Sequence, residues 1–178
     1  DYVSAAGYMD TAIEVMNRYG YSSDVRTVDF CTGRAAISTA DGRADEAKEF
    51  YVRALTLLSD AYDSIPREDS AYRLVVLLCS MGEMYALSGD SVTAQAFAYS
   101  AKKAAQSSFL SDDLTCVLAD AALGNIHTVS GDCDEAEKCF GRVISVLKNQ
   151  LADEKNSVLQ IIDSMLEINE KNRECRKR

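Results

Sequence analysis

The chain has 178 residues, of which 47% are hydrophobic and 26% charged, with one proline and no tryptophan. That length suits one domain with a buried core, and no run approaches the roughly 18 apolar residues of a membrane span. The net charge is −9 although residues 171–178 hold five basic side chains and one acidic, so the acidic body repels phosphate backbones and argues against nucleic-acid binding.

Apolar residues recur with helical spacing along the chain, and proline is almost absent. These features predict an all-α fold of about eight helices. The expected helices lie near residues 2–19, 24–40, 43–62, 69–88, 91–108, 112–129, 133–150 and 154–173. Pro66 falls in the longest link, where it ends a helix without breaking one. The last helix is apolar on one face, as expected of a helix that caps the end of a stack.

A pattern of glycine, alanine and aromatic residues recurs in the first 150 residues. Glycines 7, 42, 89 and 131 are each followed five residues later by an alanine: 12, 47, 94 and 136. Four residues further on stand Met16, Tyr51, Ala98 and Phe140. Seven residues before the last three glycines stand Ala35, Gly82 and Gly124. We expect the small residues where two helices approach closest, the aromatic residues beside that contact, and the later glycines at left-handed helix ends.

This pattern resembles the tetratricopeptide repeat, a helix–turn–helix unit. The steps of 35, 47 and 42 residues between the glycines exceed the usual repeat of about 34 and resemble the long-repeat branch that includes kinesin light chains. The resemblance implies an α-solenoid of antiparallel helix pairs in a right-handed superhelix. Residues 1–150 would form about four repeats, the first incomplete, and residues 151–178 a capping helix with a basic tail. Ser38 and His127 depart from the family by standing at tyrosine positions. The residues expected to pack the repeats are Gly42, Ala47, Tyr51, Gly82, Tyr85, Gly89, Ala94, Gly124, Gly131, Ala136 and Phe140.

The resemblance also implies that the first helix of each repeat lines a concave binding face. Its expected partner-binding residues are Asp29, Thr32, Ala36, Val76, Cys79, Glu83, Leu118, Ala121, Asn125 and Thr128. Members of the family that grip acidic chaperone tails use lysine, arginine and asparagine at such positions, and only Asn125 fits that set. The small, mostly uncharged lining instead favours an apolar or amphipathic helix. That helix could belong to a partner protein or be the chain's own 154–173 segment.

Signals for catalysis are weak. His127 stands at a packing position without a partner spaced for a triad or a metal site. The acidic runs 44–49 and 131–138 stand at helix starts, where the helix dipole favours anions. No calcium loop or phosphate-binding loop is present in the sequence. Six cysteines form no CxxC pair and suggest packed, reduced thiols: Cys31, Cys79, Cys116, Cys133, Cys139 and Cys175. We expect no enzyme activity, cofactor or metal.

The sequence therefore predicts a non-catalytic scaffold or adaptor that binds another protein. One alternative is a permanent structural or assembly subunit of a larger complex, including a mitochondrial one. Another is a helical sensor domain that regulates an attached effector. The cysteines favour a reducing, intracellular location. We expect the cytoplasm, with the mitochondrial matrix as the alternative, because the chain begins at Asp1 and is either processed or a fragment.

Overall fold

The computed structural model of the chain describes residues 1–110 and 113–150. Its helices are α1 (Tyr2–Arg18), α2 (Val25–Ala40), α3 (Ala44–Ala61), α4 (Arg67–Leu87), α5 (Ser91–Ser108), α6 (Leu114–Val129) and α7 (Cys133–Gln150), and these two ranges contain no strand. The predicted all-α fold is confirmed, and the first seven predicted helices match the observed bounds to within two residues. The eighth predicted helix and the basic tail lie outside the described residues.

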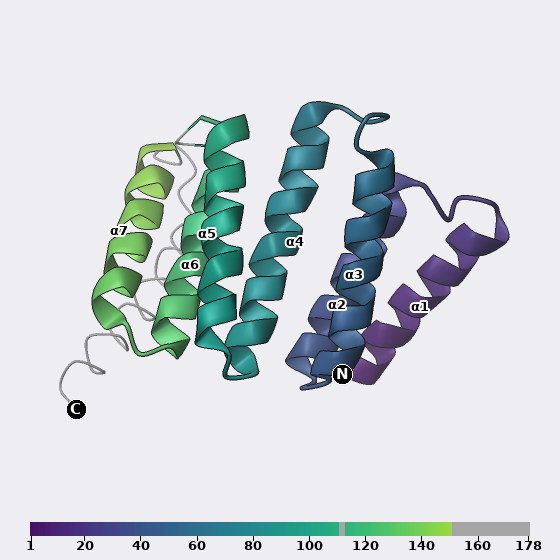
Figure 1. The fold of residues 1–178 in the computed structure, drawn as a ribbon, viewed down its shortest axis with the longest axis horizontal. Coiled ribbons are helices and arrows are strands. Elements are labelled where there is room, and N and C mark those ends of the chain that lie inside the picture. The colour runs from purple at the N-terminus through teal and green to yellow at the C-terminus, as the bar shows by residue number, and fades with distance from the viewer. Residues whose placement is uncertain (111–112, 151–178) are drawn as a thin grey trace.

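The helices stand side by side as successive pairs joined by short turns (Figure 1). Helix α2 packs on α3, α4 on α5 and α6 on α7, while α4 also contacts both α2 and α6. Helices α2, α4 and α6 thus form a first row, and α1, α3, α5 and α7 form a second row. Packing of each pair against its neighbours is what a helical solenoid requires.

The turns that end the first-row helices are built alike. Gly42, Gly89 and Gly131 have φ angles of 76°, 84° and 79°, a left-handed conformation that strains residues with a side chain. The N–H of the following residue donates to the carbonyl five residues before it, from Arg43 to Ser38, from Asp90 to Tyr85 and from Asp132 to His127.

The first copy of the sequence pattern differs from the others. Helix α1 begins at Tyr2, because the Asp1 side chain caps it by accepting from the N–H of Val3. Gly7 therefore lies inside α1. The left-handed glycine that ends α1 is Gly20, with φ 79°. Gly7 therefore marks no turn, and α1 stands alone as a second-row helix at one end of the stack.

Small residues set the separation between neighbouring helices, both within the first row and between the two rows. A Cβ built on Gly82 would lie 2.9 Å from Ile126 Cδ1 and 3.1 Å from the Ala94 carbonyl oxygen. A Cβ on Gly124 would lie 2.9 Å from two ring carbons of Phe140. Because interiors are close-packed, a side chain at either glycine would push neighbouring groups apart.

The other residues of the pattern fill the core around these contacts. The alanines Ala47, Ala94 and Ala136 are fully buried. The rings of Tyr51 and Phe140 are also buried. Tyr85, at the position that Ser38 and His127 occupy in the other pairs, stacks on Phe97 with 5.4 Å between ring centroids. Buried apolar residues thus form four clusters that are distributed from α1 to α7.

An ionic network around the buried Arg34 replaces an aromatic side chain in the first complete pair. The Arg34 side chain is 5% exposed, and it donates to Asp10 at 2.8 Å and to Glu46 at 2.5 Å. Ser38 accepts from Arg34 and donates to Glu46 at 3.0 Å. The guanidinium also lies over the Phe50 ring, 4.9 Å from its centroid. The network joins α1, α2 and α3 and accounts for serine at a position where the next pair has a tyrosine.

Candidate protein-binding surface

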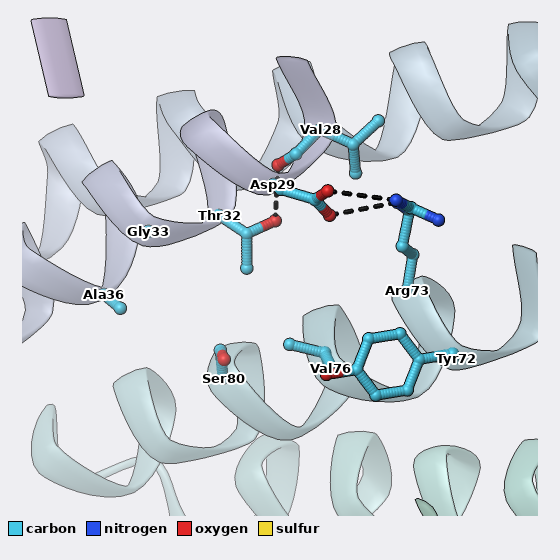
Figure 2. A pocket seen from close by; sticks show the side chains of 9 residues that line it. All are labelled: Val28, Asp29, Thr32, Gly33, Ala36, Tyr72, Arg73, Val76 and Ser80. Atoms are coloured by element: carbon cyan, nitrogen blue, oxygen red, sulfur yellow. Dashed lines mark hydrogen bonds and ion pairs between the residues drawn. The ribbon is translucent and has the colours of Figure 1, made fainter. Parts of the chain in front are cut away.

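The predicted partner-binding residues all lie on the first-row helices, and two open grooves bring six of them together. The α2–α4 groove has a volume of about 440 Å³ and is lined by Val28, Asp29, Thr32, Gly33, Ala36, Tyr72, Arg73, Val76 and Ser80 (Figure 2). The α4–α6 groove has a volume of about 190 Å³ and is lined by Glu83, Ala86, Leu87, Asn125, Ile126 and Val129.

The other four predicted residues lie outside these linings. Cys79 is 4% exposed and packs into the core instead. Leu118 is exposed on α6, and Ala121 and Thr128 are half-buried on the same helix. The first row therefore presents two grooves rather than one uniform strip.

Several lining residues were not predicted from the sequence. Tyr72, Arg73 and Ser80 stand three or four residues from Val76 on the same face of α4, and Leu87 and Val129 stand four residues beyond Glu83 and Asn125. Helical spacing of three and four would have found them if the predicted face had been extended in both directions.

The α2–α4 groove is electrically neutral. The carboxylate of Asp29 accepts from Arg73 Nε at 3.0 Å and from Nη2 at 3.1 Å, which joins α2 to α4 at one end of the groove (Figure 2). Thr32 donates its hydroxyl to the Val28 carbonyl at 2.8 Å. Apart from the half-exposed Tyr72, the remaining lining is small or aliphatic, so this groove suits apolar side chains.

Among the described residues that line the α4–α6 groove, one is charged, Glu83. The side chain is solvent-exposed, yet it lies between the walls of two helices. Burial raises the pKa of Glu83, and a hydrogen bond with Asn125 only partly counteracts that shift. The exposed area and the raised pKa are compatible, because a group in a concave surface meets water on one side and protein on the others.

His127 has a carboxylate neighbour that sequence reasoning missed. Its Nδ1 lies 3.3 Å from Asp132 Oδ2 but is not aligned for a hydrogen bond, and Nε2 lies 3.5 Å from the Tyr99 hydroxyl. The turn at Gly131 brings Asp132 back towards the ring. His127 is only 2% exposed, and its contact with Asp132 joins α6 to the start of α7.

The described part of the chain shows neither a membrane helix nor a metal centre. Among residues 1–110 and 113–150, no helix combines the length and apolarity needed to cross a bilayer. The same residues contain no group of three or more histidine, cysteine or carboxylate side chains placed to hold a metal ion.

No protein-family model matches the chain, and no curated protein matches its sequence. Function is therefore inferred from the geometry and chemistry of the first-row surface.

Proposed function

We propose that the chain is a non-catalytic protein-binding module built from tetratricopeptide-like helix pairs. It holds an apolar or amphipathic segment of a partner protein along the first row. The observation that carries this proposal is the pair of grooves on three successive first-row helices, α2, α4 and α6.

The lining of the grooves supports a helix or peptide as the occupant. Small side chains such as Ala36 and Ser80 let a partner backbone approach closely, and the rim residues Leu87 and Val129 are 66% and 56% exposed. Amphipathic helices bind such grooves through apolar side chains on one face. A clamp for an acidic tail is disfavoured, because Arg73, the one basic residue among the described residues that line either groove, is already paired with Asp29.

Two matched variants of the full chain test this proposal by affinity capture from the native source. Ala36→Tyr fills the α2–α4 groove, whereas Ala96→Tyr adds the same side chain at an exposed position of α5. We expect the first variant to lose bound proteins that the wild type and the second variant retain. Equal capture by all three proteins would contradict binding through this groove. Circular dichroism checks that both variants remain folded.

A second candidate function, a permanent subunit of a larger assembly, is favoured by the surface of α1. Tyr8 is 77% exposed, Val15 45% and Tyr19 69%, and they lie outside both grooves. Exposed apolar residues gathered on one element are typical of interaction sites. If this surface holds a permanent partner, Tyr8→Ser with Val15→Ser should release a salt-resistant partner of fixed stoichiometry. Bound proteins that leave in mild salt and depend on Ala36 instead support the adaptor.

We propose a reducing compartment, the cytoplasm or the mitochondrial matrix. The support comes from the buried thiols: burial raises the pKa of Cys31 and Cys139, and raises that of Cys79 to about 12. Such thiols are packing residues with little thiolate at neutral pH.

A further inference from the structure

We propose that the α4–α6 groove selects partner segments that place a lysine or arginine over the Glu83 carboxylate, on an otherwise apolar face. This inference rests on the proposed function and adds the chemistry of the partner. The partner's basic side chain would complete an ion pair whose acidic half is already in the groove.

Glu83 is the exception among the first-row carboxylates that lie beyond the first turn of their helix. Each first-row helix carries one carboxylate beyond its first turn: Asp29 on α2, Glu83 on α4 and Asp120 on α6. Asp29 is paired with Arg73, and Asp120 is paired with Lys102 at 2.7 Å and Arg142 at 2.9 Å. Within residues 1–110 and 113–150, Glu83 makes no ion pair.

The surroundings of Glu83 make this unpaired charge significant. The groove walls are apolar apart from Asn125, which is uncharged, and burial within them disfavours the charged form of Glu83. A cation supplied by a partner would offset that desolvation. A partner carboxylate would meet like charge, and a purely apolar partner would desolvate Glu83 further without compensation.

The shape of the groove favours a basic residue with a long side chain. Leu87 and Val129 form exposed aliphatic walls beside Glu83. Lysine and arginine pack their methylene stems on such walls while the charged head reaches a carboxylate. The partner segment is therefore expected to be amphipathic, with a single basic residue inside its apolar face rather than along its edge.

The test is selection of a displayed library of amphipathic helical peptides on the full chain, with three variants as comparisons. Glu83→Gln removes the charge and keeps the shape, Glu49→Gln removes a charge from an exposed position on α3, and Asn125→Tyr fills the groove. We expect enriched peptides to share one lysine or arginine within the apolar face. Their affinity should fall about tenfold, or 1.4 kcal/mol, for Glu83→Gln and remain unchanged for Glu49→Gln.

The other outcomes distinguish failure of this inference from failure of the proposed function. Peptides that Asn125→Tyr blocks, but that lack a basic residue or ignore Glu83→Gln, would overturn this inference and leave the proposed function standing. If Asn125→Tyr blocks no peptide, both this inference and the proposed binding of a partner at this groove are wrong. A further variant changes Ile162 and Met165 to aspartate. If peptides bind only to this variant, residues 151–178 of the chain itself occupy the groove. That result would also overturn the proposal that the groove binds a basic residue of another protein.

Discussion

Replacing Gly124 with alanine tests whether a glycine is required where α6 meets α7. On the observed backbone the new Cβ would lie 2.9 Å from Cε1 and Cζ of Phe140 and 3.2 Å from Cδ1, against about 3.5–4.0 Å for carbon atoms in contact. Phe140 is 1% exposed, so its ring has no free space to enter. Overpacking of this kind costs about 1–3 kcal/mol, whereas alanine gains about 1 kcal/mol over glycine in a helix.

Gly141 provides a matched control. It lies in α7, is exposed, and has no atom within 4 Å of a built Cβ. Gly141→Ala should therefore gain the full helix-propensity term of about 1 kcal/mol, and Gly124→Ala should fall about 1–3 kcal/mol below it. Urea unfolding with unchanged m-values measures both. If Gly124→Ala is stabilised as much as Gly141→Ala, the close contact with Phe140 does not limit the packing.

Three further predictions concern charged groups. Arg34→Ala should lower the free energy of unfolding by about 2–4 kcal/mol, because Glu46 loses its buried partner; a loss below about 1 kcal/mol in urea unfolding would show that the network is not structural. Asp120→Asn should cost about 1–2 kcal/mol. Burial opposes ionisation of Asp120, but hydrogen bonds from two basic neighbours outweigh it and lower the pKa of Asp120 from 3.8. The stabilisation by the Asp120 carboxylate is therefore present above about pH 4 and lost as the pH falls through the lowered pKa. If Asp120→Asn lowers the free energy of unfolding as much at pH 3 as at pH 7, this reasoning is wrong. For Glu83 the effect on stability has the opposite sign, because the raised pKa means that the charged form destabilises the fold. Glu83→Gln should therefore unfold at a higher temperature than the wild type at pH 7 and at the same temperature below about pH 4.5. A lower melting temperature of Glu83→Gln at pH 7 would refute the desolvation of this carboxylate.

The ion pairs that join different helices could not be predicted from the sequence. Arg34 on α2 contacts Asp10 on α1 and Glu46 on α3. These partners lie 24 and 12 residues away in the sequence, so helical periodicity does not indicate the pairing. Arg73 and Asp29 are 44 residues apart. Such pairs form only after helices from different parts of the chain lie side by side, so a sequence pattern confined to one helix does not indicate them.

Helical periodicity, capping and left-handed glycine depend on residues within a few positions of one another. The sequence was therefore enough to predict the seven described helices and the turns at Gly42, Gly89 and Gly131. It also indicated which small residues stand between the rows. The packing of the helices, by contrast, selects which first-row residues line a groove, pairs Arg73 with Asp29, and leaves Glu83 without a cation among the described residues. Those properties depend on how far apart and at what angle neighbouring helices pack, which is set by the whole core and not by any single segment.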